Sequence, residues 1–168
     1  LWCQGAGETD AASAIASCWV GCDRIRRRRQ HWCIPFAPIF STYAYIEARN
    51  STAKVSIGEG TWINNGFSAI AEHTSITIGR RVLIGTNVEV FDSDFHGIRV
   101  EDRMASRAEW AKPVVIEDDV FLGSNVRVMK GVTIGRGSVI ANSSLVVSDV
   151  PPGSLAGGNP ARVIKAVG

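Results

Sequence analysis

The histidine at position 96 is the side chain of this sequence best suited to moving a proton near neutral pH. Its imidazole titrates close to neutrality, so it can take a proton from a weak nucleophile such as a hydroxyl and return it to a leaving group. Asp92 and Asp94 precede His96, and Glu101 follows it. One of these carboxylates, or a backbone carbonyl, would orient the ring and raise its basicity. The pattern predicts a general base.

Asp92, Asp94 and His96 also suggest a metal site, because alternate residues of an extended strand share one face. The chain contains only 3 histidines, however, and no HxxxxH spacing includes His96. A catalytic zinc site normally has several histidine or cysteine ligands. We therefore expect no catalytic metal.

A six-residue repeat lies on both sides of His96. Neither helical spacing nor strict alternation explains a period of six. Each hexapeptide predicts one short strand and one turn of a coil with three flat faces, with an aliphatic side chain inside. A small residue beside it lets the chain bend at the corner. The repeated aliphatic positions are Ile116, Leu122, Val128, Ile134, Ile140 and Val146, with earlier members at Ile57, Ile78 and Ile84.

The repeat is interrupted in two places. It disappears after Val90 and returns at Ile116, which predicts a polar loop extruded from the coil over residues 91–115. Long loops on a regular scaffold are usually functional. The repeat also slips by three residues, and we place this slip near residues 64–66, where a bulge or turn is expected.

The hexad pattern covers about residues 55–151 and resembles the left-handed parallel β-helix of the hexapeptide-repeat acyltransferases. The closing sequence PPGSLAGGNPARVIK is similar to that of sugar and maltose O-acetyltransferases. The predicted fold class is all-β, with the β-helix over residues 51–168. An N-terminal arm over residues 1–50 precedes it, with a candidate helix from about residue 11 to residue 29.

The last residues are expected to close the prism. Pro151 and Pro152 should end the coil, since proline cannot donate to a strand ladder. The segment 152–168 would then form a cap, with a short strand or helix around Arg162 to Lys165.

The resemblance implies an acetyl-CoA-dependent O-acetyltransferase with His96 as the base. The implied acceptor is a saccharide hydroxyl, either of a surface-polysaccharide unit or of a free sugar. Family members extrude a loop that completes an active site against a neighbouring subunit, so a homotrimer with sites between subunits is also implied. The partners expected are therefore further copies of this chain and a small hydroxyl acceptor.

The acceptor side of the site is implied by a second group of residues. Asn64 aligns with a polar residue that contacts the acceptor in related enzymes, and we place it with His96 in the catalytic set. Asn65 is the alternative counterpart. Trp62 offers a stacking face to a sugar ring, and Glu72 and Asp94 offer carboxylates to its hydroxyls.

The coenzyme side is implied by residues in the later coils. A backbone amide in the sequence FLGSN is expected to face the thioester and to stabilise the oxyanion. Polar side chains are expected along the pantetheine groove, and two basic residues near the end should meet the CoA phosphates. Relatives often carry lysine at position 148, so a phosphate contact there should be weaker. The implied residues are Gly123, Ser124, Asn142, Ser148, Arg162 and Lys165.

Composition and charge argue against several other classes of protein. The formal net charge of +2 does not indicate a nucleic-acid partner. No segment is long and apolar enough to suggest a membrane span. The four cysteines, at positions 3, 18, 22 and 33, include no short CxxC pair beside His31. We interpret them as reduced thiols of a cytoplasmic protein.

Two other functions fit part of the pattern. An antibiotic acetyltransferase of the same fold would use the same histidine and coenzyme groove, and only the acceptor pocket would differ. A non-enzymatic β-solenoid scaffold would need neither the histidine loop nor the NPARVIK ending.

Overall fold

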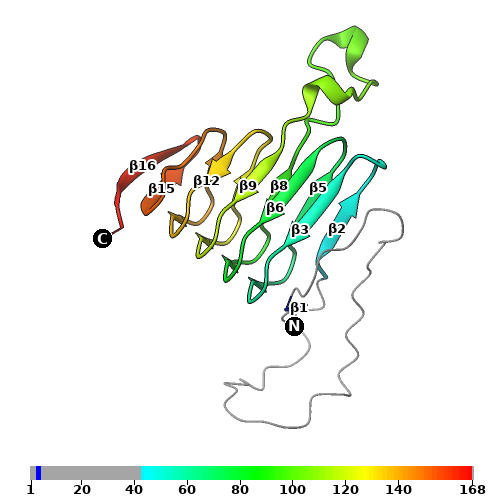
Figure 1. The fold of residues 1–168 in the computed structure, drawn as a ribbon. Coiled ribbons are helices and arrows are strands. Elements are labelled where there is room, and N and C mark those ends of the chain that lie inside the picture. The colour runs from blue at the N-terminus through cyan, green and yellow to red at the C-terminus, as the bar shows by residue number, and fades with distance from the viewer. Residues whose placement is uncertain (1–2, 5–42, 168) are drawn as a thin grey trace, which may run out of the picture.

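The computed structural model describes residues 3–4 and 43–167 of the 168-residue chain. The candidate helix over residues 11–29 and the residues Cys18, Cys22, His31 and Cys33 lie outside this part. In the described part the chain winds into flat coils stacked along one axis, with a loop projecting from one edge (Figure 1). The prediction of an all-β parallel solenoid is confirmed.

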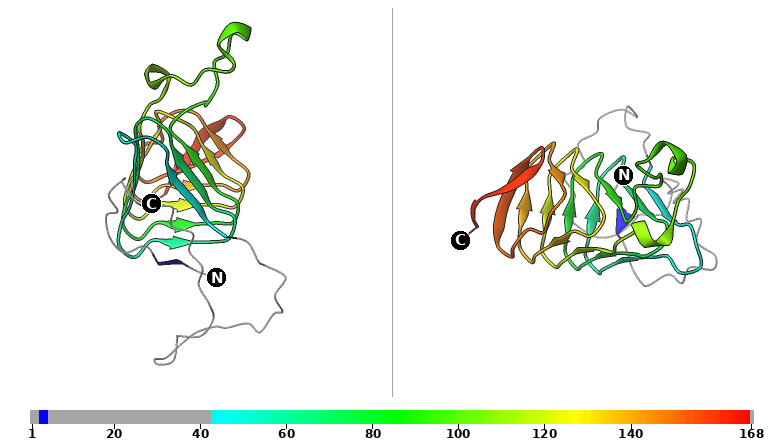
Figure 2. Two further views of the ribbon diagram at one scale, coloured as in Figure 1. Left: turned by 90° about the vertical axis from the view of Figure 1, so that its right-hand side faces the viewer. Right: turned by 90° about the horizontal axis from the view of Figure 1, so that it is seen from above.

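Three sheets form the faces of the prism, and successive coils add one strand to each (Figure 2). Adjacent strands are parallel, except that β1 and β16 pair antiparallel at the two ends of sheet A. Sheet A contains β1 (Cys3–Gln4), β4 (Trp62–Ile63), β7 (Leu83–Ile84), β10 (Phe121–Leu122), β13 (Val139–Ile140), β15 (Ser154–Gly158) and β16 (Ala161–Ala166). Sheet B contains β2 (Tyr45–Ala48), β5 (Ser68–Ala71), β8 (Glu89–Phe91), β11 (Arg127–Val128) and β14 (Leu145–Val146). Sheet C contains β3 (Lys54–Ile57), β6 (Ser75–Ile78), β9 (Val114–Ile116) and β12 (Thr133–Ile134).

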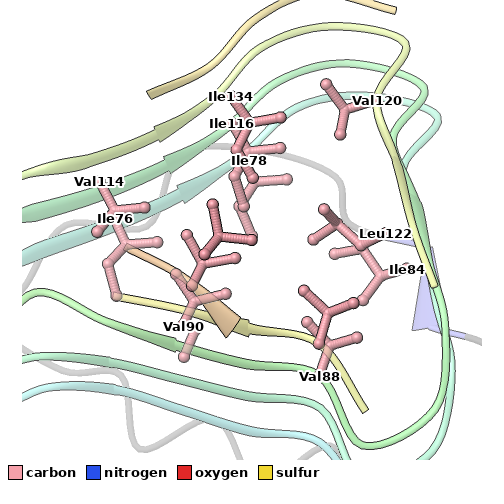
Figure 3. Packing of buried hydrophobic residues seen from close by; sticks show 14 of the residues in the cluster. Ile76, Ile78, Ile84, Val88, Val90, Val114, Ile116, Val120, Leu122 and Ile134 are labelled. Atoms are coloured by element: carbon pink, nitrogen blue, oxygen red, sulfur yellow. The ribbon is translucent and has the colours of Figure 1, made fainter. Parts of the chain in front are cut away.

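The core consists of aliphatic side chains that repeat from coil to coil. In sheet C, Ile78, Ile116 and Ile134 occupy equivalent positions on paired strands and lie one above another (Figure 3). Ile84 and Leu122 form the corresponding column in sheet A. All five are 0–2% exposed. Burying each such side chain contributes roughly 1.5–3 kcal/mol, so these columns are the main stabilising feature of the prism.

The corners require left-handed backbone conformations. Asn87 and Asn125 have φ values of 54° and 59° at equivalent corners of adjacent coils, between sheets A and B. Asparagine tolerates this region better than most residues. The Asn87 side-chain amide donates to the Asn125 side-chain oxygen at 3.3 Å, which ties the two corners together. The sharp turn and the ladder between coils therefore use the same side chains.

Charged residues stack at the corner between sheets C and A. The Arg81 guanidinium donates to both carboxylate oxygens of Asp119, at 2.6 and 2.9 Å, and this holds the pKa of Asp119 below its ordinary value of 3.8. The pKa of Asp118 is lowered by the backbone N–H of Arg80 and then by Arg136. Both carboxylates therefore stabilise the fold above about pH 4, and this contribution is lost as the pH falls through their lowered pKa values.

The three-residue slip lies at a different corner from the predicted one. Ile63 and Ala69 are one hexad apart, so residues 64–66 form an ordinary corner. The extra residues lie between Ala69 and Ile78, at the corner between sheets B and C. The loop leaves from that corner in the next coil, after β8, and covers residues 92–113. Both interruptions therefore lie at one edge of the prism.

The solenoid also extends beyond both expected ends. Strand β2 pairs in parallel with β5, so the coils begin by Tyr45, before the expected boundary at residue 51. Pro151 and Pro152 do not end the coil, because β15 follows them and pairs in parallel with β13. Both prolines lie at a corner, where Pro151 needs no N–H and its carbonyl accepts from the Ser138 hydroxyl at 2.7 Å.

The closing segment is a strand, which settles the strand-or-helix alternative. β16 folds back on β15 as an antiparallel hairpin, and its turn contains the cis peptide bond between Asn159 and Pro160. Within the described residues, no helix is long and apolar enough to span a membrane.

Val146 and Val147 provide a matched test of the inward and outward positions. Val146 is fully buried, whereas Val147 is 46% exposed on the next residue of the same segment. We expect Val146→Ala to lower the free energy of unfolding by about 2 kcal/mol, because it removes two buried methyl groups and leaves a cavity. Val147→Ala should change it by less than about 0.5 kcal/mol. Chemical denaturation measures both, and equal effects would contradict the assigned core.

Candidate active site

The extruded loop, residues 92–113, projects from the prism (Figures 1 and 2), and its sequence includes His96. It contains two short 3-10 helices, η1 (Val100–Asp102) and η2 (Ala108–Trp110). The two legs of the loop meet at its base, where the Lys112 N–H donates to the Asp92 carbonyl at 2.8 Å. The loop is thus closed at its base by a hydrogen bond between its two legs.

The His96 imidazole is exposed and is held by a backbone carbonyl. Its Nδ1 lies 2.7 Å from the carbonyl oxygen of Arg103, just after η1. Because a carbonyl oxygen can only accept, Nδ1 carries the proton in this arrangement, and Nε2 keeps the lone pair that a general base needs. Of the orienting groups left open by the sequence, the backbone carbonyl is the one observed.

Asp92 has a structural role at the enlarged corner. Its buried carboxylate accepts backbone N–H groups from Glu72 at 2.7 Å, His73 at 3.1 Å and Thr74 at 2.7 Å, and the Thr74 hydroxyl at 3.0 Å. These are the residues that the slip adds to the second coil. A carboxylate with this many donors is strongly held, so Asp92 fixes the point where the loop leaves the prism.

Glu72 connects this corner to the start of the loop. Its carboxylate is mostly buried and accepts the Ser93 hydroxyl at 2.8 Å, and the Ser93 oxygen accepts the Phe95 N–H at 2.9 Å. Its neighbour His73 places Nε2 3.2 Å from the Ser106 oxygen on the returning leg of the loop. Glu72 was expected to contact the acceptor; within this chain its carboxylate binds Ser93 and also lies 4.0 Å from the Arg49 guanidinium and 3.9 Å from His73 Nε2.

The predicted site residues lie at two different corners of one chain. Those between sheets A and B face away from the loop, whereas those between sheets B and C lie on its side. Trp62 is on the outer face of sheet A, and the two basic residues are exposed on β16. The first corner holds Asn64, Asn65, Gly123, Ser124 and Asn142, and the second holds Glu72, Asp94, His96 and Ser148.

The predicted oxyanion donor already has a partner within the chain. The Ser124 N–H donates to the side-chain oxygen of Asn142 at 2.9 Å. Gly123, beside it, lies so close to the next coil that a Cβ there would be 2.8 Å from the Asn142 nitrogen. Both residues therefore serve coil stacking, and Asn142 would have to turn away before the amide could face a thioester.

A polar groove of about 220 Å³ follows the corner between sheets A and B. It runs beside the predicted coenzyme residues but is lined mainly by side chains that the sequence reasoning missed. Asn87 and Asn125 could have been found from their left-handed corner positions. The ion pair of Glu89 and Arg127 required the strand register. The lining residues are Asn87, Glu89, Asn125, Arg127, Ser143, Ser144, Leu145 and Asn159.

The described residues contain no group of three or more His, Cys, Asp or Glu side chains arranged to hold a metal ion. Asp92 and Asp94, which suggested such a site with His96, have other partners. Asp92 binds backbone N–H groups, and Asp94 pairs with Lys130.

Two family models match the chain. Residues 113–147 match the bacterial transferase hexapeptide (six repeats), and residues 75–104 match the hexapeptide repeat of succinyl-transferase. The structure is similar to a hexapeptide-repeat acetyltransferase from Vibrio cholerae O1 biovar eltor complexed with acetyl coenzyme A. The TM-score is 0.63 and the sequence identity 37%, over 73% of this chain and 68% of that one.

Two curated relatives are sugar-modifying enzymes. The polysialic acid O-acetyltransferase of Escherichia coli O1:K1 / APEC is 42% identical over 113 residues, or 67% of this chain. The galactoside O-acetyltransferase of Escherichia coli (strain K12) is 32% identical over 137 residues, or 81% of this chain. The chain spans only 36% and 61% of their respective lengths.

Replacement of Asp92 tests its role at the corner. Asp92→Ala would leave one buried and two partly buried backbone N–H groups without this acceptor, so we expect a loss of about 2–4 kcal/mol in the free energy of unfolding. Asp94→Ala is the matched control, because Asp94 is exposed and its ion pair should contribute less than about 1 kcal/mol. Global denaturation of both variants makes the comparison. Equal stability of Asp92→Ala and wild type would contradict this role.

Proposed function

Because the chain belongs to the hexapeptide-repeat transferase family, with its left-handed parallel β-helix, we propose that it transfers an acetyl group from acetyl-CoA to a saccharide hydroxyl. The observation that carries this proposal is the hydrogen bond of His96 Nδ1 to the Arg103 carbonyl. It leaves Nε2 free as a base on an exposed loop.

His96 supplies the proton transfer. Nε2 accepts the proton of the acceptor hydroxyl as its oxygen attacks the thioester carbonyl, and the Arg103 carbonyl stabilises the imidazolium that forms. When the carbon–sulfur bond breaks, the imidazolium returns the proton to the departing thiolate. The products are an acetyl ester and the free thiol, and no group is oxidised or reduced. When bound, acetyl-CoA provides the activated acetyl group.

The groove between sheets A and B fits the pantetheine arm. Its lining provides amide groups from Asn87, Asn125 and Asn159, which suit a long chain that itself carries amides. The groove leads towards the hairpin that carries Arg162 and Lys165, both exposed. These two cations are the proposed phosphate contacts.

A complete site requires a second copy of the chain. His96 projects from the corner between sheets B and C, whereas the groove follows the corner between sheets A and B. The loop also exposes three large apolar side chains, Ile98, Val100 and Met104, which are 88%, 75% and 94% exposed. Apolar surface of this kind favours burial against a partner. We therefore include a homotrimer, in which the loop of one subunit reaches the groove of the next.

The acceptor is proposed from the relatives. Two of them are named for polysialic acid and a galactoside, which are both saccharides. An outward Trp62 on sheet A suits a sugar ring, and Asn64 and Asn65 at the adjacent corner suit its hydroxyls. The reaction uses the acetyl-CoA pool, so the proposed location is the cytoplasm.

His96→Ala should abolish most turnover without changing the fold. We expect kcat to fall on the order of 100-fold or more, since the variant has no base for the hydroxyl proton. Thiol release from acetyl-CoA, measured on a panel of sugars, nucleotide sugars, acidic polysaccharides and antibiotics, identifies the acceptor and provides the rate. His96→Gln should be equally slow.

Calorimetry with CoA is the control for this experiment, because both His96 variants should bind CoA as the wild type does. Near-normal turnover in either variant would remove His96 from the role of base. Turnover on an antibiotic alone would identify an antibiotic, and not a saccharide, as the acceptor. Failure of the wild type to bind CoA would favour a scaffold instead.

The trimer is tested by light scattering at micromolar concentration, where we expect three times the mass of one chain. Replacing two apolar loop residues, Ile98→Ser with Met104→Ser, should weaken assembly at least about tenfold, because each side chain loses roughly 1.5–3 kcal/mol of burial. Val147→Ser, on an exposed valine outside the loop, should leave the mass unchanged. A wild-type monomer would contradict the composite site.

A further inference from the structure

Lys130 forms a bridge across the base of the extruded loop. It follows β11 in the coil after the one from which the loop leaves. Its Nζ donates to the Asp94 carboxylate at 2.5 Å and to the Trp110 carbonyl at 2.7 Å. Asp94 lies on the outgoing leg of the loop and Trp110 on the returning leg. One ammonium group therefore binds both legs of the loop.

The coil itself does not require a lysine at this position. The hexad needs an inward aliphatic residue, which is Val128, and a corner residue with positive φ, which is Gly131 at 76°. The Lys130 side chain is only 22% exposed, and both of its bonded partners belong to the loop. A partly buried ammonium is stable only with such partners. The position thus serves the loop and not the solenoid.

A short, well-fixed segment connects this bridge to the proposed base. After Asp94 comes Phe95, with φ at 61°, and its ring meets that of Phe91 edge to face at 5.5 Å. The Arg49 guanidinium lies 4.9 Å from the centre of the Phe95 ring. His96 is the next residue, so the contacts of the Phe95 ring help to fix the backbone that leads into it.

The imidazole is also held by residues that follow it in the loop. The Arg103 carbonyl that binds Nδ1 belongs to the turn after η1, and the Gly97 N–H donates to the Asp102 carbonyl at 3.3 Å. The direction of the imidazole therefore depends on the position of this turn relative to the residues that precede His96. A bridge that holds both legs at their base maintains this relation.

We propose that Lys130 is a positioning residue, which aims His96 Nε2 by bridging Asp94 and Trp110. The consequence for turnover rests on the proposed function, whereas the consequence for the imidazole does not. Asp94 then acts as the partner of Lys130 and not as an acceptor contact. Enzymes lose large rate factors when a reacting group is displaced by about 1 Å, so the effect should appear in kcat.

Lys130→Met removes the ammonium but keeps the aliphatic stem. We expect kcat to fall about tenfold or more, while KM for acetyl-CoA stays within about twofold, because Lys130 does not line the groove. Lys130→Arg should recover most of the rate. Asp94→Asn should resemble Lys130→Met, and the double variant should be no slower than the slower single one, because both remove one interaction.

Lys112→Met is the matched control. Lys112 also lies at the base of the loop, with its stem against Gly131, but it takes no part in the bridge. This variant removes the same charge and should keep wild-type kcat and KM. A loss equal to that of Lys130→Met would show a general charge effect and would overturn the proposal.

Nuclear magnetic resonance of the His96 ring provides a readout that needs no acceptor. In the wild type and in Lys112→Met, the ring nitrogens should report a proton on Nδ1; in Lys130→Met, this signal should shift or broaden. An unchanged ring signal in Lys130→Met would overturn the proposal, even if no acceptor is found. A fall in kcat matched by lower CoA affinity and a lower melting temperature would also overturn it, by assigning Lys130 to general stability.

Discussion

The structure depends on the register between successive coils. Parallel strands lie about 4.8 Å apart, so each backbone must follow the path of the one below it on all three faces. Ile78, Ile116 and Ile134 can form one column only because this path repeats. An extra residue cannot be absorbed within a face, since it would turn every later side chain to the wrong side. Insertions must therefore leave at a corner, and the described coils place theirs at the corner between sheets B and C.

The stacked coils and their inward aliphatic positions were predictable from the sequence, because the hexad is a direct consequence of the repeating path of the backbone. The position of the slip was not, since Asn and Gly occur at ordinary corners as well as at bulges. Asn64 and Gly66 therefore looked unusual when they were not. The buried pair Phe67 and Ala69 was the decisive signal, because it keeps the hexad in phase beyond residue 66.

The sequence predicts His96 as the base, but it does not identify the group that orients its ring. Three carboxylates and a backbone carbonyl all fitted the pattern, and the observed partner is the carbonyl of Arg103, which no residue type reveals. The same holds for Ser124, whose N–H is taken by a side chain one coil away. Sequence gives the chemical character of a side chain, but contacts between distant backbone groups depend on the path of the loop. The assignment of residues to corners likewise required the strand order.

The two antiparallel strands at the ends of sheet A also affect how prisms can meet. A solenoid made of identical parallel coils would offer each end as a template for the next molecule, as in fibre growth. β1 and β16 run against the direction of their neighbours, so a further parallel coil would not match their hydrogen-bond pattern. On this face, the outermost described strands therefore disfavour the stacking of a further parallel coil, whereas the sides of the prism carry no such reversed strand.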